Sequence, residues 1–366
     1  MCIPMHRRTG ILLFLAALLL PLAIASIWQG MAHAQPDSDL NLIPTETRGD
    51  GIEDILPRIQ CVHGYTATIY AQGLSSPDGL AFSPAGALYV SEETAGRVSQ
   101  IGPAGQVTPV ITGLNSPEGI TFDTNGSLYV VEDRQAGRLI KRASNGPTTT
   151  LVTDLDAPEG IVWTSDDVLY VTESNAQFTV DPTDLRAHVT AVSPSGLTTR
   201  IVTLTPTIRG TEVEFQSYAG LSVGPEGLLY VTNELSGQEE TIVVIPGILT
   251  FTLSTTDSVL TVDPATGARS LFASDLVAPE GLHFSRDGEF PLYVAEEDTG
   301  GGGGRLSRIE ADGSHTPVCT GFFNIEDVTM DQKGWLYVSE DSSGLLILIK
   351  PPHVWLPLIL KNANHK

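Results

Sequence analysis

Acidic side chains recur at two fixed positions of a motif that the chain repeats six times. The first position lies just before an apolar strand, as in Ser-Pro-Glu-Gly-Ile. Its occupants are Asp78, Glu118, Glu159, Glu280 and Glu326. In the fourth repeat Ala219 takes that place. Carboxylates brought together at one place repel one another unless they bind a cation or take up protons. The spacing therefore points first to cation binding by oxygen ligands.

The size of this repulsion makes a bound ion the simplest interpretation. Two like charges about 4 Å apart repel by ~4 kcal/mol at an effective dielectric constant near 20. The motif contains neither cysteine nor clustered histidine, so a hard cation is expected, and calcium tolerates many carboxylates in irregular geometry better than magnesium does. We expect the ligands to be a subset of the five acids, with Asn233 as a neutral oxygen donor. The alternative is that each carboxylate accepts backbone N–H groups at its strand entrance and holds no ion.

The second acidic position ends each Leu-Tyr-Val strand, in the pattern Tyr-Val-x-Glu. Its occupants are Glu92, Glu132, Glu173, Glu296 and Glu340, with Asn233 in the fourth repeat. In three repeats a basic residue begins the next predicted strand: Arg97, Arg138 and Arg305. We expect these glutamates to fix their own loops or to pair with the arginines rather than to bind the ion.

His283 is a titratable exception on the predicted inner strands, three residues after Glu280. The other repeats hold Ala81, Thr121, Val162, Ser222 and Thr329 at this position. His283 is the candidate catalytic residue, as a proton acceptor for a metal-bound water or an attacking hydroxyl, and a hydrogen-bonded core histidine is the alternative. The sequence has no Gly-x-Ser-x-Gly elbow, glycine-rich phosphate loop or His-Glu-x-x-His, which excludes the serine hydrolase, nucleotide-enzyme and zincin classes.

Each repeat predicts four antiparallel strands, and a period near 40 residues is typical of a β-propeller. The first acidic position advances by 40, 41, 60, 61 and 46 residues from one repeat to the next. We predict an all-β, six-bladed β-propeller over residues 65–349, in which an N-terminal strand at Ala67–Leu74 completes the last blade. The two long steps predict insertions in blades three and four, at 174–186, 205–217 and 234–257, the last containing a hairpin. All three fall on the side of the acidic motifs. A seven-bladed ring is the alternative.

The N-terminus predicts export. Residues 1–34 combine a basic pair, an apolar run and Ala-His-Ala before Gln35, which is typical of a cleaved signal peptide. An uncleaved N-terminal anchor is the alternative. We therefore predict a secreted protein, extracellular or periplasmic, with an N-terminal extension at 35–64, a C-terminal tail at 350–366 and no membrane span in the mature chain.

Charge and cysteine content fit such a compartment. The formal net charge is −23, which argues against binding to nucleic acid or to an anionic membrane and fits a cation binder. Cys61 and Cys319 would meet oxidising conditions after export, so that a disulfide between them is permitted.

The whole repeat, Pro-Glu-Gly-Ile-x-Phe-x-x-x-Gly-x-Leu-Tyr-Val-x-Glu-x-x-x-Gly-Arg, resembles NHL-repeat propellers. With its acids before the inner strands, it is also similar to the senescence marker protein/gluconolactonase superfamily, which includes paraoxonase-like lactonases. In those lactonases, acids and amides at these positions hold a catalytic calcium or related divalent ion. The resemblance implies that role here for Asp78, Glu118, Glu159, Glu280 and Glu326. The pair Glu326-Asp327 looks like their Glu-Asp motif, whereas Ala219 and the nearly uniform acids depart from their mixture of Asn, Glu and Asp.

The resemblance implies a hydrolase that acts on a small lactone or ester with a divalent cation, Ca²⁺ first, as cofactor. One alternative is a non-catalytic NHL-type module that binds a protein or glycan on the face with the insertions. Another is an enzyme like the streptogramin lyases, whose repeats run Gly-Ile-x-x-x-x-x-Gly-x-Leu-Trp-Phe-Thr-Glu. Here Tyr-Val replaces Trp-Phe, and their catalytic histidine loop has no match.

Overall fold

The computed structural model of the protein describes the six repeats and most of the segments between them. The described residues are 55–62, 64–175, 184–209, 212–234, 241–244, 249–254, 257–285, 288–297 and 303–352. The chain divides into two compact units, Met1–Gly49 and Asp50–Lys366, and the first lies outside the described residues. The predicted signal peptide is part of that unit, so export stays a prediction. No helix in the described ranges is long and apolar enough to cross a membrane.

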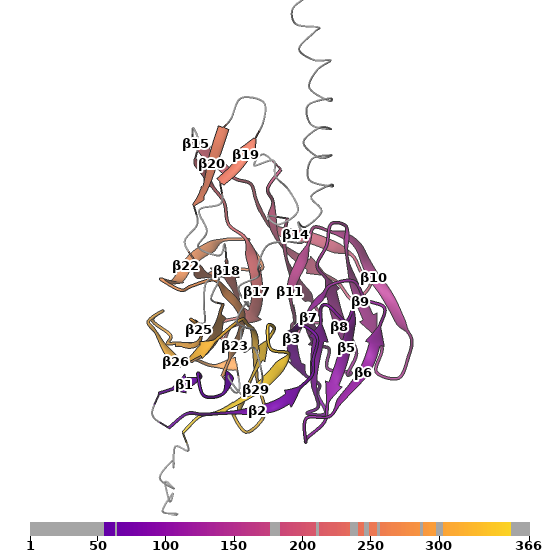
Figure 1. Ribbon diagram of the computed structural model, residues 1–366. Helices are drawn as coiled ribbons and strands as arrows, with labels where there is room; N and C mark the ends of the chain where they lie inside the picture. Colours follow the sequence, from indigo (N-terminus) through magenta and orange to yellow (C-terminus); the bar gives the residue numbers. More distant parts are fainter. Residues whose placement is uncertain are drawn as a thin grey trace, which may run out of the picture. The chain divides into compact units, whose positions relative to one another are not determined.

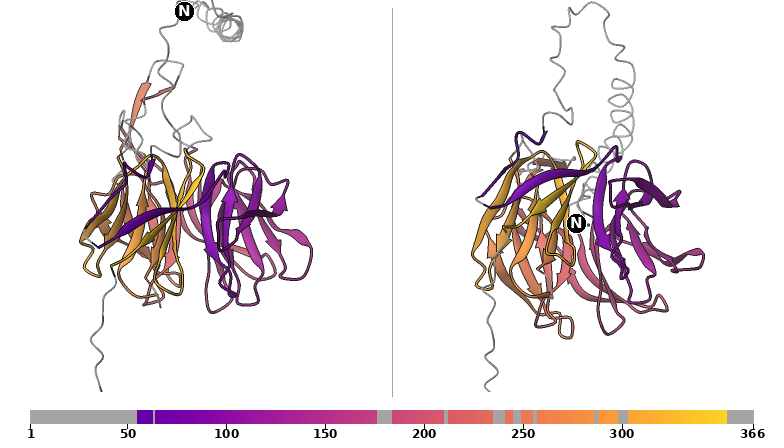
Figure 2. Two further views of the ribbon diagram at one scale, coloured as in Figure 1. Left: turned by 60° about the horizontal axis from the view of Figure 1, so that its bottom comes forward. Right: turned by 90° about the horizontal axis from the view of Figure 1, so that it is seen from below.

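Six four-stranded antiparallel blades follow one another in chain order (Figures 1 and 2). Blade 1 comprises β3 (Pro77–Phe82), β4 (Leu88–Glu92), β5 (Arg97–Ile101) and β6 (Val107–Thr112). Blade 2 comprises β7 (Pro117–Phe122), β8 (Leu128–Glu132), β9 (Gly137–Arg142) and β10 (Thr148–Leu155). Blade 3 comprises β11 (Pro158–Trp163), β12 (Leu169–Ser174), β13 (Ala187–Val192) and β14 (Thr198–Leu204).

The second half of the ring repeats this order. Blade 4 comprises β17 (Tyr218–Val223), β18 (Leu229–Asn233), β21 (Ser258–Val262) and β22 (Arg269–Ser274). Blade 5 comprises β23 (Pro279–Phe284), β24 (Leu292–Glu296), β25 (Gly304–Ile309) and β26 (His315–Phe322). Blade 6 comprises β27 (Ile325–Met330), β28 (Leu336–Glu340), β29 (Leu345–Lys350) and the N-terminal strand β2 (Thr66–Gln72). The six-bladed prediction is confirmed and the seven-bladed alternative is wrong.

The N-terminal segment closes the ring across two blades. Strand β2 pairs antiparallel with β29 from Thr66–Lys350 to Gln72–Leu345, so that the last blade is completed as predicted. The short β1 (Gln60–Cys61) adds a fifth strand to blade 5 by pairing with β26. Cys61 and Cys319 are directly opposite each other there and form a disulfide. Both contacts cover sheet edges that would otherwise be open to another chain.

The insertions form a sheet of their own. Strands β15 (Thr207–Arg209) and β16 (Glu212–Glu214) precede blade 4, and β19 (Thr241–Val244) and β20 (Leu249–Ser254) interrupt it. The predicted hairpin is confirmed by the antiparallel pairing of β19 with β20. Strand β16 pairs parallel with β20, which joins the two insertions into one four-stranded sheet. The repeats gave no signal for this long-range pairing.

Aromatic contacts between neighbouring blades explain two apolar positions of the motif. The tyrosine of Leu-Tyr-Val packs against the last residue of the next inner strand, as in Tyr89 with Phe122 and Tyr230 with Phe284, both with ring centroids 4.9 Å apart. At the closure Tyr337 of blade 6 packs against Phe82 of blade 1 at 5.3 Å. The same aromatic contact therefore stabilises the packing between consecutive blades and the junction between blade 6 and blade 1.

Candidate functional site

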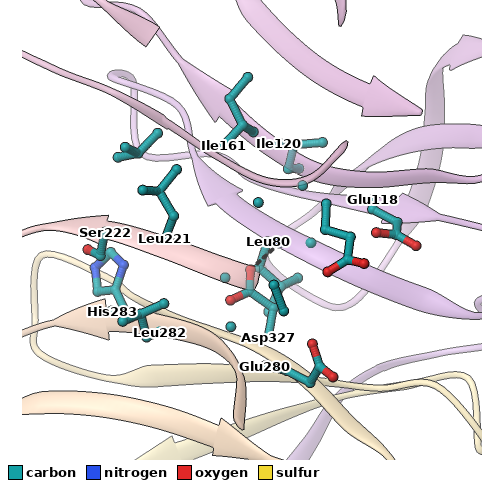
Figure 3. Close-up of a pocket in the computed structure, with 18 of the residues that line it drawn as sticks. Leu80, Glu118, Ile120, Ile161, Leu221, Ser222, Glu280, Leu282, His283 and Asp327 are labelled. Carbon is teal, nitrogen blue, oxygen red and sulfur yellow. Dashed lines mark hydrogen bonds between the residues drawn. The ribbon is translucent and has the colours of Figure 1, made fainter. Parts of the chain in front are cut away.

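A central cavity of about 550 Å³ is lined by the inner strands of all six blades (Figure 3). Each inner strand contributes the residues between its acidic position and its end. The inner strands are β3, β7, β11, β17, β23 and β27. Because all six start at the same end of the ring, residues at one motif position form one layer of the cavity wall. The cavity is of the size that proteins use for small molecules.

The five predicted acids line the cavity together. We call Asp78, Glu118, Glu159, Glu280 and Glu326 the inner acid set. Each is the second residue of its inner strand and keeps part of its surface open to the cavity. Burial raises the pKa of every member well above its usual range, and neighbouring carboxylates raise it further. For Glu118 these neighbours include Asp78 and Glu159. No lysine or arginine occurs among the described residues that line the cavity.

The inner acid set lies at one end of the cavity, which we call the mouth. The backbone conformation there brings these acids together. The residue before the motif proline has a positive φ in four blades, from 39° at Ala278 to 51° at Ala157, a conformation that is unfavourable for residues with a side chain. The glycine after the acid permits close approach of the next blade. A Cβ on Gly119 would lie 2.3 Å from the carbonyl oxygen of Glu159. The motif therefore packs the entrances of the inner strands tightly against one another.

A third group of acids, not expected from the sequence, surrounds the same mouth. We call Glu93, Asp133, Glu234, Glu297 and Asp341 the outer acid set; each directly follows the Tyr-Val-x-Glu or Tyr-Val-x-Asn pattern. The backbone N–H of each bonds the carbonyl of the loop before an inner strand, as in Glu93 to Ser76 at 2.9 Å. All five raise the pKa of at least one inner acid. A Tyr-Val-x-Glu motif extended by one residue at its end would have included these five acids.

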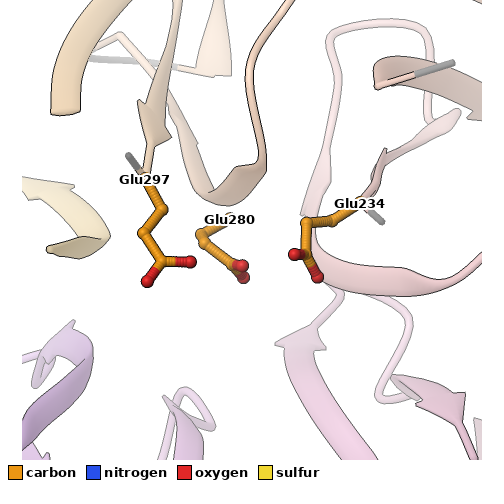
Figure 4. A group of neighbouring side chains, drawn as sticks. All are labelled: Glu234, Glu280 and Glu297. Carbon is orange, nitrogen blue, oxygen red and sulfur yellow. The ribbon is translucent and has the colours of Figure 1, made fainter. Parts of the chain in front are cut away.

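Three of these carboxylates come close enough to share one ion. Ligand oxygens of Glu234, Glu280 and Glu297 lie within 4.8 Å of one another (Figure 4). Two of the three belong to the outer acid set. Asn233, which we expected to be a ligand, is 1% exposed and lies beside Ser258. It is absent from the described lining of the cavity, where its neighbour Glu234 appears instead.

The glutamates of Tyr-Val-x-Glu are tied down as predicted. We call Glu92, Glu132, Glu173, Glu296 and Glu340 the buried glutamates; all are 0% exposed. Glu92 accepts two hydrogen bonds from Arg97, both at 2.6 Å. Arg138 and Arg305 bind Glu132 and Glu296 in the same two-pronged way. Each buried glutamate also accepts a backbone N–H from the loop before its inner strand.

Asp327 occupies the glycine position of the sixth blade and joins it to the first. Its carboxylate accepts the backbone N–H of Leu80 at 2.7 Å, across the junction of β27 and β3 (Figure 3). It also accepts the N–H of Val328 at 2.7 Å. Burial raises the pKa of Asp327 to about 7, although both hydrogen bonds act in the opposite direction. The resemblance drew attention to this residue, whereas its contact with Leu80 follows only from ring closure.

The wall changes character below the acids. First comes an aliphatic layer, one side chain per blade: Leu80, Ile120, Ile161, Leu221, Leu282 and Val328. The next layer contains Ala81, Thr121, Val162, Ser222, His283 and Thr329. Burial lowers the pKa of His283 to about 4, so that its imidazole is neutral at pH 7. His283 thus lines the cavity, three residues beyond Glu280 along β23.

Comparison with known proteins supports the fold. No model of a known family matches the chain, and no curated protein does. A gluconolactonase from Xanthomonas campestris is 17% identical with a TM-score of 0.61, covering 80% of this chain and 91% of that one. A second protein solved as a gluconolactonase is 15% identical, with a TM-score of 0.57 over 79% and 93% of the two chains. A streptogramin B lyase is 12% identical, with a TM-score of 0.51 over 78% and 98%.

Proposed function

We propose that the protein binds a divalent cation, calcium first, at the mouth of the cavity and hydrolyses a small lactone or ester there. The six-bladed fold is that of gluconolactonases, which is consistent with lactonase-like hydrolysis. The observation that carries the proposal is the accumulation of ten carboxyl groups, the inner and outer acid sets, at one mouth. With no basic side chain in the described lining, a cation is the simplest way to balance them.

The donor set fits a hard cation. Calcium binds oxygen at about 2.3–2.6 Å, so that oxygens on opposite sides of one ion lie up to about 5 Å apart. The oxygens of Glu234, Glu280 and Glu297 meet this limit. We propose these three as the main ligands, with further oxygens from the inner acid set.

The residues of the mouth can also handle the proton of the attacking water. A bound divalent cation supplies Lewis-acid polarisation of the substrate carbonyl. The inner acids hold protons more readily than ordinary carboxyls because burial raises their pKa. Asp327, with a pKa of about 7, is suited to exchange a proton near neutral pH. His283 lies about 10 Å further along β23 at the usual rise per residue, which makes it a weaker candidate for this role than the carboxyl groups at the mouth.

Metal analysis and an activity screen test the proposal. Purified protein should contain calcium or take it up, and calcium should raise the melting temperature relative to the chelated sample. Lactones and aryl esters should be hydrolysed with calcium and not with chelator. A folded sample that neither binds nor is stabilised by saturating calcium would remove the basis of the proposal.

Matched variants locate the ion. Glu234→Gln should lower calcium affinity about tenfold or more, since it removes one charged ligand from the trio. Glu93→Gln is the control, because Glu93 belongs to the same outer acid set but lies in blade 1 and outside the trio. Equal losses in the two variants would show diffuse attraction by the mouth instead of a defined site.

The separate sheet formed by the insertions favours a second candidate function. Both insertions leave and rejoin the propeller at the mouth end, since they precede β17 and follow β18. Elaborated loops on one face of a rigid scaffold are common at binding surfaces. Calcium binding in the absence of any hydrolysis would favour this candidate over the hydrolase. The streptogramin-lyase alternative rests on the fold alone.

A further inference from the structure

The layer below the aliphatic ring has hydrogen-bonding side chains side by side on one wall. Ser222 of β17 and His283 of β23 occupy the same position on neighbouring inner strands, and both line the cavity. Figure 3 shows the imidazole next to Ser222, apart from Glu118 and Glu280. Within the described residues, neither side chain makes a hydrogen bond to another group. Val162 precedes Ser222 in this layer and has no hydrogen-bonding side chain. Thr329 follows His283 and is only 3% exposed.

We propose that Ser222 and His283 form the far end of the substrate site and hydrogen-bond a terminal hydroxyl or carbonyl group of the ligand. The inference rests on the proposed hydrolytic function and names its substrate class. That class is an uncharged amphiphile, with a lactone or ester group at the acidic mouth, an alkyl segment in the middle and a second oxygen function at the other end.

The middle of the cavity carries the alkyl segment. Between the acids and the Ser222–His283 pair, every blade contributes one aliphatic side chain, and each of the six is also part of a buried cluster between blades. Such a ring offers no hydrogen bond from its side chains, so that a sugar hydroxyl at this depth would lose its water without a replacement partner. A methylene chain gains from the same contact.

Charge argues against an anionic ligand. Ten carboxyl groups outnumber the charge of one divalent ion, so that the mouth disfavours the entry of an anion even with the ion bound. At the far end His283 is neutral at pH 7, because burial lowers its pKa. A neutral imidazole offers one donor and one acceptor, and the Ser222 hydroxyl offers both as well. The pair therefore matches a hydroxyl or carbonyl group better than an ion.

Binding of two non-hydrolysable lactams tests this assignment. The probes are a γ-lactam with an unbranched hexyl chain and the same lactam with a hydroxyl at the chain end, titrated calorimetrically into the calcium-loaded full chain. The wild-type protein should bind the hydroxyl-ended lactam about tenfold more tightly, as expected for one or two additional hydrogen bonds. Because binding is measured, the result does not depend on turnover.

Variants identify the residues responsible. Ser222→Ala and His283→Leu should each reduce the preference for the hydroxyl-ended lactam about three- to tenfold, whereas His283→Gln, which keeps a donor and an acceptor, should retain part of it. Thr121→Val is the matched control, because it removes a hydroxyl from the same layer on β7. It should leave the preference within about twofold. Melting temperatures close to that of the wild type confirm that each variant is folded.

The outcomes separate this inference from the proposed function. A preference that depends on Ser222 and His283, in a protein without hydrolytic activity, would support the far-end site and remove the hydrolase. Hydrolysis of lactones by a wild-type protein that shows no preference would do the reverse. The inference is overturned if neither lactam binds, if Ser222→Ala and His283→Leu both keep the full preference, or if Thr121→Val loses as much as they do.

Discussion

The buried glutamates and the inner acid set recur with the same period, yet their surroundings differ. A buried glutamate such as Glu92 is fully enclosed and held by Arg97, Ser99 and a backbone N–H. An inner acid such as Glu118 faces a cavity in which the described lining has no basic residue, and its pKa is raised by burial and by other carboxylates. The first group can stabilise the blades, whereas the second costs stability until a proton or cation arrives.

Variation among the blades supports this division. In blade 4, where Ser258 stands opposite the end of β18 in place of an arginine, Asn233 replaces the glutamate, so that both members of the pair change together. In blade 3, His188 stands opposite Glu173, and Arg200 approaches the glutamate at 3.5 Å from the outer strand. In blade 6 Leu345 stands opposite Glu340, and backbone N–H groups hold the carboxylate in place of an arginine. Each fully buried glutamate of the described residues therefore has several donors, charged or neutral. The inner acids follow no such rule.

Removal of an arginine should have the largest effect on stability. Arg97→Met would leave Glu92 fully buried without its charged partner and should lower the free energy of unfolding by about 3 kcal/mol. Urea denaturation measures the change. The double variant Glu92→Asn with Arg97→Ser copies the pair found in blade 4 and should recover part of the loss. A single variant that costs less than about 1 kcal/mol would contradict the structural role of the buried glutamates.

The raised pKa values of the inner acids and Asp327 should make the stability of the protein depend on pH. A carboxyl whose pKa is raised on folding binds more protons in the folded than in the unfolded state between the two pKa values. The free energy of unfolding therefore falls as pH rises through that window, by about 1.4 kcal/mol per pH unit for each extra proton. For Asp327 the window runs from its ordinary value of 3.8 to about 7. Calcium should oppose this fall.

Urea denaturation at several pH values, with calcium and with chelator, measures this linkage. The stabilisation by calcium should grow from about pH 4 to pH 7, because the ion competes with protons for the same carboxyl groups. Calcium stabilisation that is constant over this range would show that the mouth acids are not its ligands.

Loss of one inner acid should have the opposite sign from loss of a buried ion pair. Glu118→Gln removes one of the repelling charges and should raise the free energy of unfolding of the calcium-free protein by about 1 kcal/mol at pH 8. With calcium present this gain should shrink or reverse. Thermal melts in chelator measure the first effect. Destabilisation in chelator would place Glu118 with the buried glutamates in structural function.

The sequence predicts the parts of this molecule that recur in every blade and misses the parts that have no counterpart in the other blades. The period predicts the number of blades, the strand that completes blade 6 and the pairing of Arg97 with Glu92, because each of these features repeats the pattern of the other blades. The parallel pairing of β16 with β20 joins two insertions that have no counterpart in other blades, so that no internal comparison could suggest it.

Only part of the candidate site was predicted, again because the prediction depended on residues that recur from blade to blade. The inner acids were found because five blades repeat them. Glu234 and Glu297 were missed because the motif was ended one residue too early, although side chains alternate along a strand and the next residue can face the mouth. Asn233 was expected to be a ligand, yet it occupies the position of the buried glutamates and lies beside Ser258.

Asp327 is the most sensitive test of the difference between the buried glutamates and the inner acid set, because it has features of both. Its carboxylate accepts backbone N–H groups, as the buried glutamates do, but it lines the cavity and its pKa is raised to about 7. Asp327→Asn should change the free energy of unfolding at pH 7 by less than about 1 kcal/mol, since the lost acceptor is offset by the loss of a buried charge. It should also flatten the pH dependence of the calcium-free protein between about pH 5 and pH 7. Asp331→Asn is the control for loss of a carboxylate acceptor, because Asp331 accepts two backbone N–H groups in a turn and is not among the described residues that line the cavity; it should lower stability. An unchanged slope in Asp327→Asn would assign the carboxylate to the structural group.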